Sequence, residues 1–332
     1  MLYQTPNPHG GDVYTEPVQL DFSTSLNPLR TPPAVIDAIK QAAEHADCYP
    51  DPYCRKAMAV ISRHEGVSPE SILMGNGAAE LIYSFCQAAA PRSALIAMPT
   101  FSEYEAALTG SGSRVIYHKL LNENDFILQE NFAEVILNSR PNVVFLCNPN
   151  NPTGRLIDAS LLRKALTLCE IIKARLFLDE SFLELSDAKP AMNALVAEHP
   201  SLFLLKSLTK SYALAGIRIG YCLSSDHYLL QRMSRSVQPW NVSTIAQAAA
   251  EAAMNEAEYI HEALDLIKFE RKYLRTALSG LGFQVCPSEA NFLLFRAQAG
   301  LDAELRKKGI VIRNCVNFNG LGRGWLDRKS VV

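Results

Sequence analysis

The sequence predicts an α/β fold, in which a mostly parallel central sheet is flanked by helices and accompanied by a smaller α+β lobe. Two kinds of pattern predict this architecture. From about residue 70, short apolar runs typical of buried strands alternate with segments whose apolar residues recur at helical spacing. After Val242 the alternation gives way to a segment at 244–278 that is rich in Ala and free of Gly and Pro, which favours helix.

The strands of the central sheet are expected at the short apolar runs. These runs are ALIAM (94–98), RVIYH (114–118), VVFLC (143–147), RLFLD (175–179), LFLL (202–205) and IRIGYCL (217–223). Helices are expected at 75–89 and 161–174, where the apolar residues follow a helical period. Because parallel strands need crossover connections and helices usually supply them, this alternation indicates a parallel sheet.

The chain is expected to divide into a large and a small unit. Residues 45–242 form the predicted large domain. The β-like runs at 283–296 and 310–315 follow the helical segment and place a smaller α+β domain at 243–332. Residues 1–44, rich in Pro and Gly, are expected to form an arm that packs on another surface and contributes to the small lobe.

Composition argues for a soluble protein without nucleic acid, membrane or metal partners. Of the 332 residues, 48% are hydrophobic and 20% charged, and the net charge of −2 shows no basic bias. The eight cysteines are scattered without a CxxC pair, which favours reduced core cysteines over disulfides or metal ligands. The polar N-terminus does not resemble a signal peptide, and no apolar run is long enough to span a membrane. A cytoplasmic location is therefore expected.

Polar clusters follow three successive strands of the predicted sheet. NPNNPTG (148–154) follows one run, DESF (179–182) completes the next and KSLTK (206–210) follows the third. Each cluster has an ordinary structural alternative: the first could be a turn, Asp179 a helix N-cap and Lys210 a solvated loop lysine. Because the carboxyl ends of parallel strands meet at one edge of a sheet, where active sites collect, their joint occurrence favours a shared site.

An amide, a carboxylate and a lysine at one edge match the requirements of pyridoxal 5′-phosphate. Its aldehyde needs a lysine amine, and its ring nitrogen needs a carboxylate that keeps it protonated, so that the ring acts as an electron sink. Its phosphate needs backbone N–H groups at a helix N-terminus together with hydroxyl and arginine donors. GNGAAE (75–80), which opens a predicted helix, supplies the first of these, and Ser207 and Arg218 are candidates for the others.

Cations are unusually placed in LLKSLTKSYALAGIRIGY (204–221). Lys206 and Lys210 interrupt an apolar run, and Arg218 lies in a run that resembles a buried strand. Because a buried cation is costly without an anion, we interpret the cofactor phosphate as the partner of Arg218. Lys210 is expected to be the reactive amine and Lys206 a structural residue, since Lys206 directly prolongs the strand.

The motifs NNPTG, DES, SLTK and AGIRIGY resemble those of fold-type I pyridoxal-phosphate enzymes of the aminotransferase class I and II superfamily, and the resemblance covers residues 9–321. It implies that Lys210 and Asp179 are the catalytic residues, with Lys210 bonded to the cofactor aldehyde and Asp179 paired with the ring nitrogen. The other implied cofactor contacts are Phe101 on the ring face, Asn151 at the ring hydroxyl, and Gly77, Ala78, Ser207 and Arg218 at the phosphate. Tyr49 of YPDPY is implied to reach the phosphate across a homodimer interface, so the active sites would be shared.

Within that superfamily the sequence resembles the L-threonine-O-phosphate decarboxylases of cobalamin biosynthesis more closely than the histidinol-phosphate aminotransferases. HGG (9–11) and DFSTSLNPL (21–29) are similar to the opening of the decarboxylases, although HGG alone could be a disordered tail. Phe182 stands where aminotransferases carry a tyrosine that donates to the ring hydroxyl. The resemblance implies a small phosphorylated amino acid as substrate. The implied contacts are His9, Gly10, Asn27, Asn151 and Arg313, the last of which has a surface arginine as its alternative.

The similarity to the superfamily ends near Leu321. Its members continue there into a strand whose last arginine binds the substrate carboxylate, followed by a helix, whereas this chain reads GLGRGWLDRKSVV (320–332). Neither Arg323 nor Arg328 lies in a β-like alternation, so neither is assigned that role, and the small lobe is expected to be truncated by a strand and a helix. The remaining hypotheses are the decarboxylase, an aminotransferase acting on a phosphorylated amino acid such as histidinol phosphate, and a non-catalytic protein with the same fold.

Overall fold

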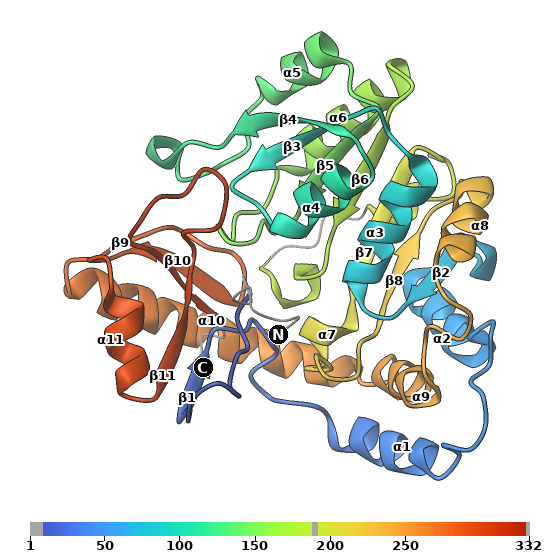
Figure 1. The fold of residues 1–332 in the computed structure, drawn as a ribbon, viewed down its shortest axis with the longest axis horizontal. Helices are drawn as coiled ribbons and strands as arrows, with labels where there is room; N and C mark the ends of the chain where they lie inside the picture. The colour runs from blue at the N-terminus through green and yellow to red at the C-terminus, as the bar shows by residue number, and fades with distance from the viewer. Residues whose placement is uncertain (1–8, 188–191, 330–332) are drawn as a thin grey trace.

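The computed structural model describes residues 9–187 and 192–329, which fold around two sheets (Figure 1). The larger sheet has seven strands in the order β2-β8-β7-β6-β5-β3-β4. Its strands are β2 (Ile72–Gly75), β3 (Ser93–Met98), β4 (Arg114–Lys119), β5 (Val143–Cys147), β6 (Arg175–Asp179), β7 (Leu202–Ser207) and β8 (Gly220–Leu223). From β4 to β7 the strands run parallel, whereas β8 is antiparallel to both of its neighbours. The predicted α/β architecture with a mostly parallel sheet is confirmed.

Helices cover both faces of this sheet (Figure 1). The core of one face contains α3 (Ala78–Ala89), α4 (Ser102–Gly110) and α8 (His227–Ser236), and the core of the other contains α2 (Arg55–Glu65), α5 (Phe132–Ser139), α6 (Ala159–Ile171) and α9 (Thr244–Ala253). Successive residues of β5 alternate between these cores, with Phe145 in the first and Leu146 in the second. Because the inner strands are buried on both faces, they read as continuous apolar runs in the sequence.

The smaller sheet takes strands from both ends of the chain. Its order is β1-β11-β12-β10-β9. The strands are β1 (Leu20–Phe22), β9 (Gln284–Val285), β10 (Phe292–Arg296), β11 (Ile310–Asn314) and β12 (Trp325–Lys329). β1 is parallel to β11, and β12 is antiparallel to β10 and β11. The long helix α10 (Ala257–Gly280) packs on this sheet, and α11 (Leu301–Lys307) connects β10 to β11. The division into domains at 45 and 242 stays a prediction.

Two further helices and several short turns complete the described part of the chain. α1 (Pro33–Ala43) packs along α9, and α7 (Leu208–Ser211) is a single turn. Short 3-10 turns lie at Pro69–Ser71, Asn122–Asn124, Leu183–Leu185 and Asn193–Leu195. The helical segment expected at 244–278 is divided, since α9 ends at Ala253 and α10 begins at Ala257.

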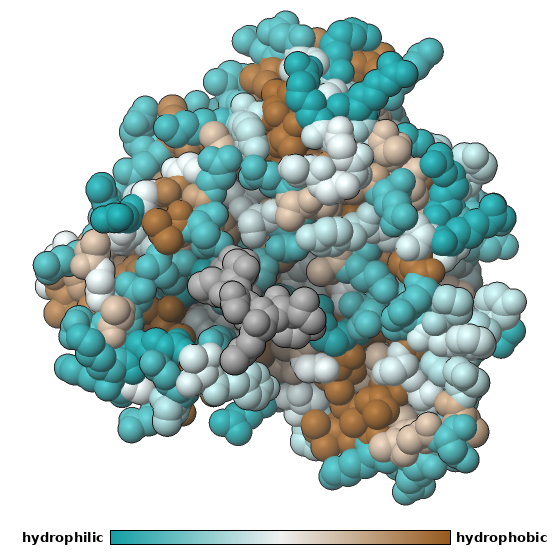
Figure 2. All heavy atoms as spheres, viewed as in Figure 1, coloured by the Kyte–Doolittle hydropathy of each residue, from teal (hydrophilic) through white to brown (hydrophobic). Residues whose placement is uncertain are grey.

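Figure 2 shows that the face of the molecule seen in Figure 1 is covered largely by hydrophilic residues, with hydrophobic residues in separate patches. The apolar sides of the helices therefore face the interior.

The strand expected at 217–223 is shorter than predicted. β8 begins at Gly220, and Arg218 lies in the preceding loop, exposed and with a φ of 62°. The prediction that Arg218 is buried within a strand was therefore wrong. The isoleucines on either side of it, Ile217 and Ile219, pack against the core, which explains why the loop has a strand-like pattern.

The C-terminal segment forms a strand where none was predicted. β12 lies between β10 and β11, so the expectation that the small lobe lacks this strand was wrong. Its pattern is interrupted because the buried Asp327 lies opposite Arg313 of β11. Arg328 of β12 lies over the ring of Phe22, 3.9 Å from the ring centre. Asp327 and Arg328 of β12 thus have partners on strands that are distant in sequence, and no local pattern reveals them.

Membrane-spanning helices, metal-binding clusters and disulfides can be looked for in the described part of the chain. No helix within residues 9–187 and 192–329 has the length and apolarity needed to cross a membrane. In the same ranges, no cluster of three or more His, Cys, Asp or Glu side chains could hold a metal ion. The eight cysteines form no disulfide, and all except Cys48 are buried. Residues 1–8 of the predicted arm lie outside the described residues.

Candidate active site

A cavity of about 370 Å³ lies at the carboxyl ends of β5, β6 and β7. The first turns of α3 and α4, the N-terminal segment and β11 complete its walls. The predicted site residues that line it are His9, Gly10, Ala78, Phe101, Asn151, Asp179, Ser207, Lys210, Arg218 and Arg313. The structure therefore brings together residues from both ends of the chain at the sheet edge where the sequence predicts a site.

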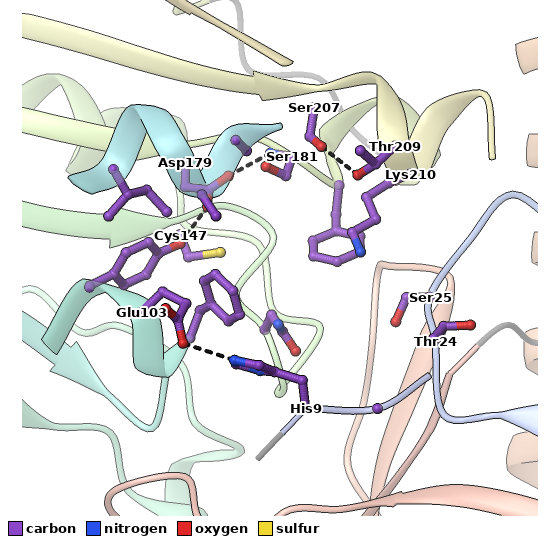
Figure 3. A pocket seen from close by; sticks show the side chains of 18 of the residues that line it. His9, Thr24, Ser25, Glu103, Cys147, Asp179, Ser181, Ser207, Thr209 and Lys210 are labelled. Atoms are coloured by element: carbon purple, nitrogen blue, oxygen red, sulfur yellow. Dashed lines mark hydrogen bonds and ion pairs between the residues drawn. The ribbon is translucent and has the colours of Figure 1, made fainter. Parts of the chain in front are cut away.

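Lys210 is presented by α7, the helical turn that follows β7 (Figure 3). It is half-buried, and its Nζ lies 5.6 Å from the centre of the Phe182 ring. The N-terminal segment holds this turn in place. The backbone N–H of Asn27 donates to the Lys210 carbonyl oxygen at 3.0 Å, and its side-chain amide donates to the Ser211 carbonyl oxygen at 2.8 Å. The lysine amine thus enters the cavity from a turn that is hydrogen-bonded to a distant segment.

Asp179 ends β6 and is 4% exposed. Its Oδ1 accepts from the backbone N–H of Ser181 at 2.8 Å, and its Oδ2 accepts from the hydroxyl of Tyr104 at 2.6 Å. Burial raises the pKa of Asp179, while the hydrogen bonds from Ser181 and Tyr104 and the charge of Lys210 oppose that rise. The result is a buried carboxylate whose ionised form is supported by two donors, which suits the binding of a cationic ring nitrogen.

Tyr104 is a candidate functional residue that the sequence predictions missed. It is fully buried on α4, and its ring meets the ring of Phe101 edge to face at 5.7 Å. Burial and the adjacent charge of Asp179 raise the pKa of its hydroxyl well above the ordinary value, so the hydroxyl remains a donor. Its position one helical turn after a predicted ring-stacking residue was the available signal, because residues at that spacing lie on the same side of a helix.

The N-terminus of α3 forms a cradle for an anion. α3 begins at Ala78, which lines the cavity, and Gly77 precedes it with a φ of 81°. A side chain at Gly77 would clash with the guanidinium of Arg218, so glycine allows that cation to lie against the helix N-terminus. The Ser207 and Thr209 hydroxyls, 2.6 Å apart, also line the cavity. Helix N–H groups, hydroxyls and an arginine together fit a phosphate group.

The turn after β5 carries Asn151 into the cavity. The other asparagines of the turn are engaged elsewhere. The side-chain oxygen of Asn150 accepts from the Thr100 hydroxyl at 2.7 Å, and that of Asn148 accepts from the Ile157 N–H at 2.8 Å. These bonds brace the turn from both sides. Among the residues of this turn, Asn151 is the asparagine that lines the cavity.

Lys206 has anionic partners of its own outside this cavity. Its Nζ lies 2.8 Å from Glu180 Oε2 and 4.0 Å from Glu65 Oε2. The hydroxyl of Tyr221 donates to Glu65 Oε1 at 2.5 Å. Burial alone would lower the pKa of Lys206, but the charges of Glu180 and Glu65 outweigh it and raise that pKa, so the amine stays protonated. A protonated amine is no nucleophile, which agrees with a structural role for Lys206.

The wall formed by the N-terminal segment and β11 contains further polar groups. Arg313 is 9% exposed and donates to the Asn314 carbonyl oxygen at 2.7 Å and to Asn317 Oδ1 at 2.9 Å. Ser25 was not predicted, although its motif was singled out. Its buried hydroxyl has no hydrogen-bond partner within residues 9–187 and 192–329, and Figure 3 shows it across the cavity from Asp179. This hydroxyl is therefore able to bind a ligand.

Some predicted residues do not line the cavity. Gly77 directly precedes Ala78, which does line it. Asn27 is buried, and its side-chain oxygen accepts from the Leu29 N–H at 3.0 Å, so both ends of its amide are bonded within the chain. Tyr49 is 80% exposed and stacks on Trp240 with the ring centres 4.5 Å apart. The ligand contacts of these residues stay predictions.

Comparison with known proteins bears on the fold and the cofactor. Residues 17–326 match the profile of the family described as aminotransferase class I and II. The chain belongs to the aminotransferase class I and II family. Enzymes of this family depend on pyridoxal phosphate, so pyridoxal phosphate is the cofactor, and the predicted fold type I is confirmed. The cradle at α3, the lysine on its turn and the buried carboxylate fit the phosphate, aldehyde and ring nitrogen of this cofactor.

The chain is similar both to threonine-phosphate decarboxylases and to histidinol-phosphate aminotransferases. It is 33% identical over 306 residues to a threonine-phosphate decarboxylase of Salmonella typhimurium, covering 91% of this chain and 84% of the relative. It is 30% identical over 314 residues to a histidinol-phosphate aminotransferase of Methanosarcina mazei, covering 92% and 82%. The structure of the histidinol-phosphate aminotransferase from Clostridium acetobutylicum superimposes with a TM-score of 0.86 at 30% identity over 94% of each chain. Because the sequence identity to the two kinds of enzyme is about equal, the choice between the two activities rests on the residues of the site.

Proposed function

We propose that this chain uses pyridoxal phosphate to decarboxylate L-threonine-O-phosphate to (R)-1-amino-2-propanol phosphate for cobalamin biosynthesis. The observation that carries the proposal is the position of His9. The HGG arm, which is similar to the opening of the decarboxylases, brings His9 to the cavity with its ring 5.8 Å from that of Phe101. There the imidazole joins Arg313 as a donor for the anionic groups of a phosphorylated amino acid.

Phe182 supports the same choice of reaction. It is buried, and its ring lies beside the amine of Lys210 in the cavity. At this position a tyrosine would donate to the ring hydroxyl of the cofactor, as the resemblance implies for aminotransferases. A phenylalanine has no hydroxyl to donate. We therefore assign the ring hydroxyl to Asn151 alone.

The remaining cofactor contacts are proposed from the resemblance and are supported by the residues that line the cavity. We assign the covalent bond to Lys210, the ring nitrogen to Asp179 and the ring face to Phe101. The phosphate contacts are the backbone N–H groups of Gly77 and Ala78, the hydroxyl of Ser207 and the guanidinium of Arg218. When bound, pyridoxal phosphate supplies an electron sink for the electron pair of a bond broken at the substrate Cα. The residues of the chain decide which bond breaks.

Decarboxylation requires the Cα–carboxylate bond to stand perpendicular to the cofactor ring, where it overlaps the π system. We propose that contacts with His9, Gly10, Asn151 and Arg313 anchor the substrate in this orientation. Asn27, whose amide is bonded within the chain, is proposed to act by holding the turn that carries Lys210. Anchoring by the phosphate contributes because it fixes the position of Cα without neutralising the carboxylate that leaves. As CO₂ departs, the electron pair of the broken Cα–carboxylate bond stays with Cα, where the electron sink stabilises it. Lys210 then donates a proton to Cα, which completes the replacement of the carboxylate by hydrogen.

A homodimer completes the proposed site. Tyr49 is exposed and does not line the cavity of its own chain, so we assign its predicted contact with the phosphate to the cavity of a second copy. Its ring is already ordered by stacking on Trp240. We propose a cytoplasmic homodimer with shared active sites, acting on a small phosphorylated amino acid without nucleic acid or membrane partners.

An aminotransferase of the histidinol-phosphate type is the second candidate. It is favoured by 30% identity to the Methanosarcina mazei relative over 92% of this chain. Such an enzyme would pass the amino group of its substrate to 2-oxoglutarate and release no CO₂. A non-catalytic protein is the candidate of another class. It would bind pyridoxal phosphate and turn over no amino-acid phosphate.

The deciding experiment supplies the cofactor-loaded protein with L-threonine-O-phosphate, with and without 2-oxoglutarate. CO₂ release and amino-group transfer are measured in the same samples, and Lys210→Ala serves as the inactive control. We expect CO₂ release that is independent of 2-oxoglutarate. Amino-group transfer without CO₂ would contradict the decarboxylase and support the aminotransferase. Neither product from a protein that binds the cofactor would support the non-catalytic alternative.

A further inference from the structure

The N-terminal arm is shaped so that His9 reaches the cavity. Gly10 lies so close to the backbone carbonyl of Ser23 that any side chain there would clash. Gly11 has a φ of 86°, a conformation that favours glycine, and its backbone N–H donates to the Ser23 hydroxyl at 2.8 Å. The two glycines of HGG thus determine the path of the arm, and His9 lies at the end of that path (Figure 3).

Glu103 binds His9 and Tyr83 at the same time. Its Oε1 lies 2.9 Å from His9 Nε2, and its Oε2 accepts from the Tyr83 hydroxyl at 2.7 Å. The hydrogen bond from His9, with help from Tyr83, lowers the pKa of Glu103 against the effect of burial. Burial and the bond to Glu103 raise the pKa of Tyr83 to about 12. At neutral pH an ionised carboxylate therefore connects the arm to α4 and α3.

The charge of Glu103 is unfavourable for an anionic ligand unless it acts through His9. Both Glu103 and His9 line the cavity, together with the cations Lys210, Arg218 and Arg313. A carboxylate in the wall repels a phosphate group directly. Its oxygens, however, are each engaged by a donor, and one of these donors is the imidazole. A carboxylate bonded to one ring nitrogen of a histidine selects the orientation of the ring.

We propose that Glu103, braced by Tyr83, is a positioning residue that orients His9 toward the phosphate group of the substrate. The cavity then distinguishes a phosphorylated amino acid from its unphosphorylated counterpart partly through Glu103, although Glu103 itself carries the same sign of charge as the phosphate. This inference rests on the proposed function, because it takes the ligand of the cavity to be a phosphorylated amino acid. The opposing view assigns Glu103 only the fastening of the arm.

The test measures the binding of L-threonine-O-phosphate and of L-threonine to the cofactor-loaded protein through the change in cofactor absorbance. We expect Glu103→Gln to weaken binding of the phosphorylated ligand about tenfold, the lower end of the range for a hydrogen bond to a charged group. Binding of L-threonine is expected to stay within about twofold, the usual error of additive effects. Because Glu103 acts through His9, the double variant with His9→Asn is expected to bind no more weakly than His9→Asn alone.

The chain offers a matched control for this substitution. Glu105 lies on the same helix and accepts from the Tyr117 hydroxyl at 2.6 Å, but it does not line the cavity. Glu105→Gln is expected to leave both affinities unchanged. Tyr83→Phe removes a single hydroxyl and is expected to reproduce the Glu103→Gln effect in a weaker form. It also provides a second measurement if Glu103→Gln folds poorly.

The outcomes separate this inference from the proposed function. Equal weakening of both ligands in Glu103→Gln, or additive effects of the His9 and Glu103 substitutions, would overturn the positioning role and support fastening alone. Unchanged affinity for L-threonine-O-phosphate would also overturn it. If the variants show the expected pattern of binding but the wild-type protein releases no CO₂ from L-threonine-O-phosphate, only the proposed decarboxylation is contradicted. A wild-type protein that binds neither ligand would contradict both.

Discussion

Replacement of Tyr104 by phenylalanine tests the environment of Asp179 most directly. The substitution removes a hydroxyl that lies 2.6 Å from Asp179 Oδ2 and leaves the fully buried ring in place. Asp179 keeps its bond from the Ser181 N–H at 2.8 Å. A hydrogen bond to a charged group contributes about 1.5–3 kcal/mol, so the ionised form of Asp179 is expected to lose about this much stabilisation.

Weaker stabilisation of the carboxylate is expected to reduce the affinity for the cofactor. Because about 1.4 kcal/mol corresponds to a factor of ten, pyridoxal phosphate should bind at least about tenfold more weakly to Tyr104→Phe. Burial already raises the pKa of Asp179, and loss of the Tyr104 bond raises it further. The ionised fraction of Asp179 at a given pH then falls, so the loss of affinity is expected to be larger at acidic than at alkaline pH. Titration of the cofactor-free protein, followed by cofactor absorbance across pH, measures both effects.

A matched hydroxyl outside the cavity provides the control. The Tyr117 hydroxyl donates to Glu105 at 2.6 Å, and Glu105 lies on the same helix as Tyr104. Tyr117→Phe therefore also removes one hydrogen bond from a tyrosine to a carboxylate. Its affinity for the cofactor is expected to equal that of the wild type. Thermal unfolding of the cofactor-free variants checks that the core is intact. Equal cofactor affinity of Tyr104→Phe and wild type across the pH range would refute the reasoning.

Three further predictions concern the reactive lysine, its carboxylate neighbour and a helix cap. Lys210→Ala is expected to abolish the absorbance of lysine-bound cofactor, and a chromophore that borohydride still reduces in this variant would contradict the assignment. Burial raises the pKa of Asp179, so its contribution to the stability of the cofactor-free protein is present below the unfolded pKa and is lost as pH rises through the folded pKa. The melting temperature of cofactor-free Asp179→Asn should accordingly increase relative to wild type as pH rises, and a constant difference across pH would oppose this. Asp226 accepts from the Leu229 N–H at 2.9 Å, which caps α8, and from Arg175 at 3.0 Å. Asp226→Ala should therefore lower the free energy of unfolding by about 1–2 kcal/mol in a urea titration, with cofactor affinity unchanged.

The cofactor end of the site could be predicted because its residues follow strands directly. Asp179 is the last residue of β6, and Lys210 lies one turn beyond β7. In a parallel sheet, neighbouring strands end at the same edge, so the order of motifs along the chain translates into proximity in space. The same logic placed Asn151 after β5. These positions required only the correct assignment of strands, which continuous apolar runs made possible.

Contacts between distant segments could not be predicted in this way. The hydrogen bond from Tyr104 to Asp179 joins α4 to β6, and the partners of Lys206 lie on α2 and directly after β6. Arg218 was placed in a strand because the isoleucines beside it are apolar, whereas the strand begins only at Gly220. A local pattern records how often a residue is buried, and it carries no information on which distant group faces it.

The sequence by itself determined the sheet, the lysine and carboxylate at its edge, and a cofactor that needs both. It could do so because burial and strand order leave a periodic signal within each element. The tertiary structure decided which polar groups surround that pair. It placed His9 against Glu103, Tyr104 against Asp179 and Asp327 opposite Arg313. These pairings depend on the packing of whole elements, since a buried or paired charge is stable only beside a partner that the fold brings to it.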